Sequence, residues 1–264
     1  MNAKAPVMFV GHGSPMYALN PGVAGALLQA QTHRFDEVEA ILVISAHWLT
    51  QGTYLTTASN PATIHDFGGF PHSLYKLSYP APGSPELARK TIATIGAKSG
   101  GRQFDVKASP TRGLDHGVWV PLRFLRPQAD IPVLQLSLDA TLSSADLVQL
   151  GAALASLREQ GIAIIASGGV THNLFDLRMH STTVAGYATR FEQWTREQVS
   201  QRNIRALENP GKLTSDFSRA HPTQEHYLPL LIAIGATDES DQLEVLEGGI
   251  INHALSMESY CWND

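Results

Sequence analysis

Three histidines each follow an apolar run with the composition of a buried β-strand. His12 follows residues 7–11, His47 follows residues 41–46, and His172 ends the run of residues 162–171. In an open, mostly parallel α/β sheet, the carboxyl ends of the strands meet at one crevice where ligands bind. Neutral imidazole is the commonest metal-ligating side chain. The pattern therefore predicts a mononuclear metal site built from distant parts of the chain.

Two further histidines lie at the expected starts of helices. His116 precedes an apolar helical run, and the adjacent Asp115 is better placed to cap that helix than to act in catalysis. Glu225 and His226 open a second apolar helix, which tolerates Pro229 in its first turn. Successive helical side chains diverge by roughly 100°, so only one of Glu225 and His226 is expected to face a metal.

The remaining histidines offer weaker signals. His33, His180 and His221 lie in polar surroundings and are expected at the surface. His253 falls within the last expected strand, and the sequence assigns it no role.

Composition and charge limit the kind of ligand. The 264 residues include 43% hydrophobic and 16% charged residues, which is typical of a globular protein, and the net charge is −5. Nucleic acid and anionic membranes require clustered Lys and Arg, and no such cluster occurs. The single Cys261 makes a thiolate site improbable, so histidines and carboxylates must hold any metal. A small-molecule substrate fits these observations best.

No targeting or membrane signal is recognisable in the sequence. The apolar run that follows residues 1–6 is shorter than a signal-peptide core, and no run approaches the roughly 20 residues that span a bilayer. We therefore expect a cytoplasmic protein.

Hydrophobic periodicity predicts one α/β domain over residues 1–264, with a central mostly parallel or mixed sheet covered by helices on both faces. The near-continuous Ile, Leu and Val runs favour strands near residues 7–10, 40–46, 53–57, 132–138, 162–167 and 253–260. Helical patterns are found near residues 22–33, 84–97, 117–125, 144–160, 185–207 and 225–235.

A long segment without helical or strand periodicity covers residues 60–83. Segments of this length in a compact domain are usually functional, and the aromatic content suits an aromatic substrate. An ordered surface excursion that packs its aromatic rings inward explains the segment equally well. It carries His65, Asp66, Phe67, Phe70, His72 and Tyr75.

Seven ordered motifs between about residue 7 and residue 258 resemble the DOPA 4,5-dioxygenase branch of the class III extradiol ring-cleavage dioxygenases. They are residues 11–16 (GHGSPM), 45–48 (SAHW), 64–71 (IHDFGGFP), 79–85 (YPAPGSP), 114–117 (LDHG), 172–174 (HNL) and 225–230 (EHYLPL). The C-terminal end, residues 259–264, does not match the family pattern.

The resemblance implies an α/β fold and a non-haem metal that takes a catechol through its two vicinal oxygens. His12 and His47 match the two histidine ligands of the family, and His226 matches the third ligand position of this branch. His172 matches an acid/base histidine that is also found on the metal when zinc fills the site. His116 matches a second pocket histidine, a proton donor or substrate contact.

The identity of the metal stays open at this point. The wider superfamily holds Fe(II) with two histidines and a carboxylate, whereas His226 stands here beside Glu225. An all-imidazole site suits Zn²⁺ as well as Fe(II).

The sequence thus predicts an Fe(II)-dependent extradiol dioxygenase that opens the ring of a DOPA-like catechol with O₂. Its expected partners are this small aromatic diol, O₂ and, as an open question, further copies of the chain. The substrate-binding residues are expected in the loop, at His65, Phe67, Phe70 and Tyr75. The alternatives are a zinc hydrolase with His172 as its base, or a protein that binds metal and ligand without turnover.

Overall fold

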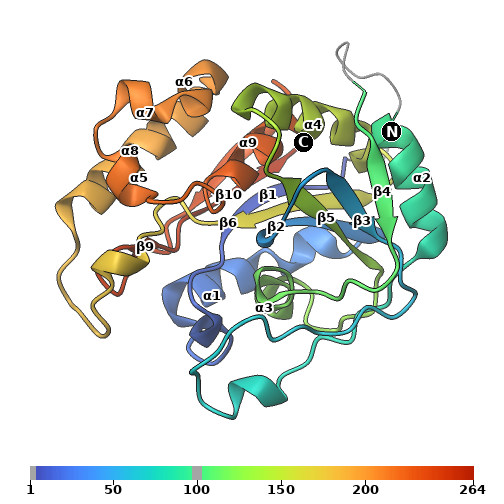
Figure 1. The fold of residues 1–264 in the computed structure, drawn as a ribbon, viewed down its shortest axis with the longest axis horizontal. Helices are drawn as coiled ribbons and strands as arrows, with labels where there is room; N and C mark the ends of the chain where they lie inside the picture. The colour runs from blue at the N-terminus through green and yellow to red at the C-terminus, as the bar shows by residue number, and fades with distance from the viewer. Residues whose placement is uncertain (1–3, 97–102) are drawn as a thin grey trace.

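One mixed eight-stranded sheet runs through the computed structural model, which describes residues 4–96 and 103–264 (Figure 1). Its strands follow the order β4-β3-β5-β2-β6-β1-β10-β7, and a separate two-stranded sheet pairs β8 with β9. The strands are β1 (Val7–Gly11), β2 (Ala40–Thr50), β3 (Thr53–Thr56), β4 (Val106–Ser109), β5 (Val133–Asp139), β6 (Ile162–Gly168), β7 (Gln242–Leu246), β8 (Ile250–Ile251), β9 (Leu255–Ser256) and β10 (Ser259–Asn263).

The centre of the sheet is parallel. Strand β6 pairs in parallel with β1 and β2, and β2 pairs in parallel with β5. Strand β10 is antiparallel to β1, and β3 is antiparallel to β5, so the sheet is mixed at its flanks. Every residue of β1, β5 and β6 is buried, because helices cover both faces of these strands.

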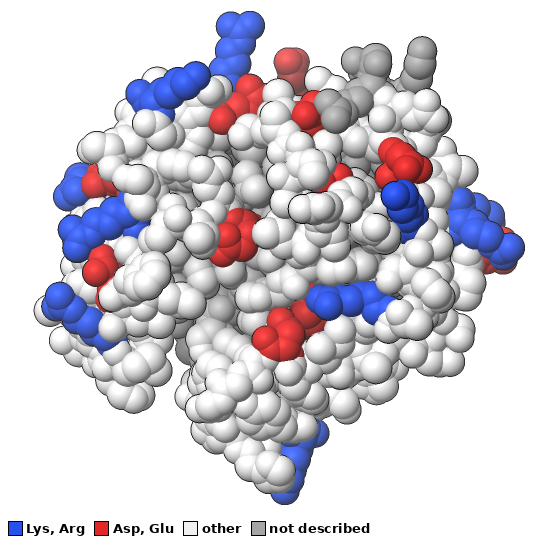
Figure 2. Space-filling model, viewed as in Figure 1, with Lys and Arg blue, Asp and Glu red and all other residues white. Residues whose placement is uncertain are grey.

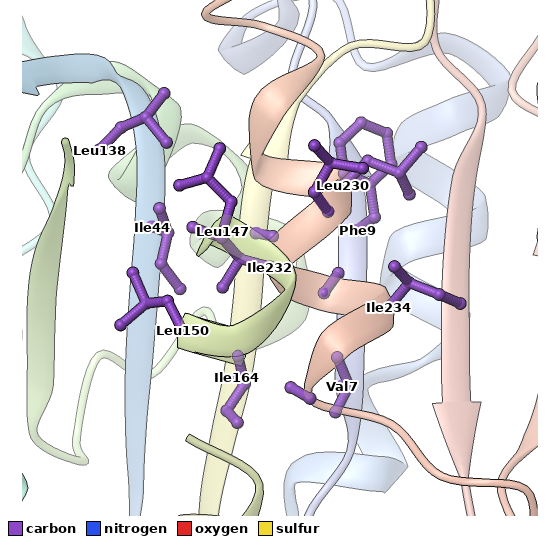
Figure 3. Packing of buried hydrophobic residues seen from close by; sticks show 14 of the residues in the cluster. Val7, Phe9, Ile44, Leu138, Leu147, Leu150, Ile164, Leu230, Ile232 and Ile234 are labelled. Atoms are coloured by element: carbon purple, nitrogen blue, oxygen red, sulfur yellow. The ribbon is translucent and has the colours of Figure 1, made fainter. Parts of the chain in front are cut away.

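Helices form a layer on each side of the sheet (Figure 1). Alternate residues of β1 belong to two different apolar clusters: Val7 and Phe9 pack with α4 and α9, and Met8 and Val10 pack with α1 and α3. Figure 3 shows the first cluster, where Leu230 and Ile234 of α9 lie beside Phe9 and Val7. The α-helices are α1 (Gly22–Ala30), α2 (Pro85–Gly96), α3 (His116–Leu125), α4 (Ser144–Arg158), α5 (Gly186–Ser200), α6 (Ile204–Glu208), α7 (Pro210–Leu213), α8 (Phe217–Ala220) and α9 (Leu228–Gly235), and the 3₁₀ turns are η1 (Pro15–Ala18), η2 (Thr32–Phe35), η3 (Leu74–Lys76) and η4 (Leu174–Asp176).

The predicted fold class is confirmed, but several expected elements have different boundaries. The single strand expected over residues 253–260 is wrong: β9 and β10 are separate, and Asn252 and His253 have left-handed φ angles of 49° and 77°, which extended strands exclude. The helix expected over residues 185–207 is two helices, because Arg202 also has a left-handed φ of 50°. The short strands β4 and β7 had no clear apolar alternation and were not expected.

The helix expected to begin at Glu225 begins at Leu228 instead. Pro229 occupies its first turn, where a missing backbone N–H costs nothing. Glu225 and His226 therefore lie in the turn before α9, and the angular divergence expected for helical neighbours does not apply to them.

A buried ion pair joins the ends of several elements away from the histidines. The Arg158 guanidinium at the end of α4 bonds both carboxylate oxygens of Asp241, and these side chains are 1% and 0% exposed. Arg158 also donates to the carbonyl oxygens of Ala5 and Ala236. The pair thus ties the start of β1 to the ends of α4 and α9. No helix within residues 4–96 and 103–264 is long and apolar enough to cross a membrane.

Candidate metal centre

Three histidines converge at the carboxyl ends of the central strands. His12 directly follows β1, and His47 lies in β2 after Ile44, where the pairing with β5 loses its regular register. His226 arrives from the turn before α9, and its carbonyl oxygen accepts a hydrogen bond from the Gly169 N–H at 2.9 Å. That approach requires Gly168, because a Cβ there would lie 2.1 Å from the same oxygen.

The three imidazoles present their nitrogens to one point. The Nε2 atoms of His12 and His47 are 2.9 Å apart, and the candidate ligand atoms of His12, His47 and His226 all lie within 4.8 Å of one another. The His226 Nε2 is buried and has no hydrogen-bond partner among the described residues. A buried nitrogen without a partner is costly and calls for an explanation.

Hydrogen bonds on the far side of two rings determine which nitrogen carries the proton. The Ser167 hydroxyl donates its only proton to the Gly117 carbonyl, so it can only accept from the His12 Nδ1, which lies 2.9 Å away. The His226 Nδ1 lies 3.0 Å from a carboxylate oxygen of Glu225, which accepts its proton. Both Nε2 atoms are then lone-pair donors, as metal ligation requires.

Burial keeps these imidazoles uncharged. Desolvation, followed by the neighbouring imidazoles, lowers the pKa of His12 and of His226 well below the usual range. Desolvation and then His116 lower the pKa of His47 to about 3. In the tautomer that Ser167 sets, the His12 Nε2 turns its lone pair toward the His47 Nε2 at 2.9 Å. The residues therefore fit a divalent metal ion held by three neutral imidazoles.

The buried carboxylate of Asp115 helps to hold the segment around His47 in position. Asp115 caps α3 by accepting from the Gly117 N–H, as expected, and also accepts from the Ser45 hydroxyl at 2.7 Å. Arg112 donates to the Asp115 carboxylate at 2.9 Å and to the His47 carbonyl at 3.3 Å. The cap is thus also part of the framework that positions His47.

His116 lies beside the three imidazoles and is held by Asp66. Its ring centroid is 3.9 Å from that of His47, and both its backbone N–H and its Nδ1 bond the Asp66 carboxylate, at 2.8 and 2.9 Å. Burial works to raise the pKa of Asp66, but the hydrogen bonds from His116 outweigh burial and lower it to about 2. The ionised Asp66 also lies 3.7 Å from the His47 Nδ1. Only its place in a His-rich loop could have pointed to this residue.

His172 lies against His226, with ring centroids 3.4 Å apart and the planes 7° from parallel. Its backbone N–H bonds the Ala220 carbonyl, and its ring makes no hydrogen bond to another described residue. Desolvation lowers its pKa to about 4, so the ring is neutral at neutral pH. His172, Glu225 and His226 also have potential ligand atoms within 4.8 Å of one another.

A cavity of about 650 Å³ opens over these histidines. Phe67 and Phe70 of the long loop line it together with His47, His116, His172 and His226. His65 and Tyr75 are not among its lining residues: both rings pack against Phe67, and the His65 Nε2 bonds the Leu77 carbonyl at 2.9 Å. Both interpretations of the loop therefore apply in part. Phe67 and Phe70 lie in the cavity wall, whereas His65 and Tyr75 pack behind Phe67.

Four further histidines do not line this cavity. His33 and His180 are exposed, as expected, whereas the surface position expected for His221 is wrong. His221 is 3% exposed, its Nε2 donates to the Val170 carbonyl at 2.7 Å, and it packs between Phe191 and Tyr227. His253 lies in the turn between β8 and β9, where its Nδ1 bonds the Thr183 carbonyl.

Residues 9–260 match the family model described as the catalytic LigB subunit of aromatic ring-opening dioxygenase. A protein of Escherichia coli (strain K12) named "4,5-DOPA dioxygenase extradiol" is 37% identical over 266 residues, which cover 98% of this chain and 94% of that protein. A protein of the same name from Beta vulgaris is 37% identical over 252 residues, 93% of each chain.

A solved structure is similar to this chain in fold as well as in sequence. The crystal structure of the uncharacterized protein JW3007 from Escherichia coli K12 superimposes with a TM-score of 0.80 at 32% identity and covers 98% of this chain and 99% of that one. A 3,4-dihydroxyphenylacetate 2,3-dioxygenase of Escherichia coli is 28% identical over 169 residues, 61% of this chain and 60% of that protein.

Proposed function

The chain belongs to the LigB family of aromatic ring-opening dioxygenases, and on that premise we propose that it is a metal-dependent extradiol dioxygenase that opens the ring of a catechol-type substrate with O₂. DOPA, which the names of two relatives contain, is the first catechol to assay.

The metal in this proposal is Fe(II), held by the Nε2 atoms of His12, His47 and His226. The convergence of three neutral imidazoles, one with a buried Nε2 that has no partner among the described residues, supports a divalent metal here. Fe(II) is preferred over Zn²⁺ because a ring-opening reaction with O₂ needs a redox-active metal. When bound, Fe(II) supplies the redox chemistry that the reaction of a catechol with O₂ requires. His47 and His226 line the 650 Å³ cavity, so a catechol bound there would lie next to a metal held by these residues.

His172 is the proposed acid/base in the cavity. Its ring is neutral and makes no hydrogen bond to another described residue, so a ring nitrogen can accept the proton of a catechol hydroxyl as the substrate binds. The same nitrogen can return that proton when the ring opens. The packing of His172 against His226 keeps it next to the proposed ligands, and its placement on the metal remains the alternative role.

His116 is the second histidine proposed to contact the substrate, and Asp66 is its positioning residue. The Asp66 carboxylate accepts from the His116 Nδ1, and Nε2 has no hydrogen-bond partner among the described residues. That nitrogen can hold a hydrogen bond to a substrate oxygen. The ring is oriented before substrate arrives, which reduces the entropy lost on binding.

Phe67 and Phe70 are the proposed contacts to the aromatic ring. They line the cavity, and their own rings meet edge to face at 5.4 Å. An apolar wall favours the substrate ring and excludes water from the reacting atoms. His65 and Tyr75 support Phe67 from behind in this proposal.

A zinc hydrolase built on the same imidazoles is the second candidate, because three neutral imidazoles also suit Zn²⁺, which has no redox chemistry. The deciding experiment is anaerobic loading of metal-free protein with Fe(II) or with Zn²⁺, followed by addition of a catechol and O₂. The proposal requires stoichiometric O₂ uptake and a ring-opened product with Fe(II) only. Bound Fe(II) without O₂ uptake from any catechol would refute it.

A further inference from the structure

A second cavity adjoins the one over the histidines. It has a volume of about 510 Å³, and Ser14, Phe70, Met179 and Asn252 line both cavities. Its remaining walls come from η1 and the start of α1 on one side and from the region of β8 on the other. A catechol ring alone occupies a small part of a 650 Å³ pocket, so the second cavity extends a site that is already larger than the reacting ring.

The lining of the two cavities is almost free of charge. Glu225 is the one Asp, Glu, Lys or Arg among the described residues that line the first cavity, and it is bonded to His226 and Thr223. The described lining of the second cavity contains none of these residue types. Among the described residues, no ammonium or guanidinium group lines either cavity to meet a carboxylate.

Exposed apolar side chains surround the opening. Phe175 is 89% exposed, Met179 is 60% exposed and Leu174 is 58% exposed, and all three line the first cavity. Figure 2 shows a notch in the lower left of the molecule with uncoloured, uncharged walls, and in Figure 1 it lies between the gold segment after β6 and the cyan segment after β3. Exposed apolar groups that border a pocket are typical of ligand-binding grooves and of interaction sites.

We propose that the groove formed by the two cavities is a subsite for an uncharged, apolar ring substituent, and that the preferred substrates are alkyl- or aryl-substituted catechols rather than catechols with a carboxylate side chain. This inference rests on the proposed ring-opening function and narrows its substrate class. The diol end binds over the histidines, and the substituent passes Phe70 and Met179 into the second cavity.

The energetic reason is desolvation. An alkyl chain gains free energy in proportion to the apolar area that it buries in the groove. A carboxylate at the same position loses water and finds no cation, which disfavours it. Arg178 lies in the sequence between Leu177 and Met179, which line the first cavity, but its side chain is exposed and lines neither cavity.

The test compares two catechols of similar length on the Fe(II)-loaded protein: 4-butylcatechol and 3-(3,4-dihydroxyphenyl)propionate. Steady-state O₂ uptake gives kcat/KM for each, and anaerobic calorimetry gives each Kd whether or not the ring opens. We expect a preference of about 10- to 100-fold for 4-butylcatechol in both measurements, as for a buried charge without a partner. Equal values, or a preference for the propionate, would overturn the inference.

Charge placed in the groove should change this ratio. Asn20 is exposed and lines the second cavity, so Asn20→Lys should reduce the preference for 4-butylcatechol about 10-fold. Asn60→Lys, at an exposed position outside both linings, adds the same charge and should leave the ratio unchanged. If both variants act alike, or if Arg178→Ala alone weakens binding of the propionate, the subsite is misassigned. Selective binding without O₂ uptake would refute the proposed function and leave the subsite standing.

Discussion

Replacement of Ser167 by Ala tests whether the hydrogen bond behind His12 determines metal affinity. The hydroxyl accepts from the His12 Nδ1 at 2.9 Å and donates to the Gly117 carbonyl, so Ser167→Ala removes the group that fixes the tautomer and orientation of the ring. Loss of such a partner typically costs 10- to 100-fold in metal affinity. This corresponds to about 1.4 to 2.7 kcal/mol of binding free energy.

Chelator competition with Zn²⁺ or with anaerobic Fe(II) measures the Kd of each variant. Ser137→Ala is the matched control, because Ser137 is also fully buried in the sheet and also makes two hydrogen bonds, to Thr50 and Tyr54, but away from the histidines. Both variants should lower the free energy of unfolding of the metal-free protein by about 1 to 3 kcal/mol. If Ser167→Ala binds metal as tightly as Ser137→Ala does, the reasoning about the tautomer is wrong.

Four further outcomes are expected. His226→Ala should lose bound metal, whereas Glu225→Gln, which only weakens the hydrogen bond to the His226 ring, should keep it with an affinity about 10-fold lower. Metal analysis of both purified proteins checks this. The reverse result would make Glu225 the ligand. His172→Ala should reduce kcat about 10² to 10⁴-fold with a much smaller change in catechol affinity, and loss of metal from this variant would instead make it a ligand. Asp241→Asn leaves a buried guanidinium uncompensated and should lower the free energy of unfolding by about 3 to 5 kcal/mol in urea titrations, so a change below 1 kcal/mol would contradict the structure. Burial lowers the pKa of His221 to about 4, so as the pH falls below about 6.5 the unfolded chain binds a proton that the folded protein does not. The contribution of His221 to the free energy of unfolding of the metal-free protein should therefore fall by about 1 kcal/mol between pH 7.5 and pH 5.5. In His221→Gln, the free energy of unfolding should depend less on pH than in the wild type.

Local patterns in the sequence were sufficient to predict the fold class and the candidate ligands at the ends of strands. Buried parallel strands read as continuous apolar runs, and the residue after such a run must lie at the crevice where strands end. His12 and His47 could be placed for this reason, and the cap formed by Asp115 is a local hydrogen bond between near neighbours. His226 needed the family resemblance, because the turn before α9 carries no periodic signal.

Tertiary structure alone decided what surrounds each imidazole. The partners of His116 and His12, Asp66 and Ser167, are 50 and 155 residues away along the chain, and no periodicity links such positions. Burial of His221 likewise depends on aromatic rings from α5 and α8 that the polar residues next to it do not reveal. Protonation state and tautomer follow from burial and from hydrogen bonds across the fold, and both of these are set by packing between elements rather than by the residues next to each histidine.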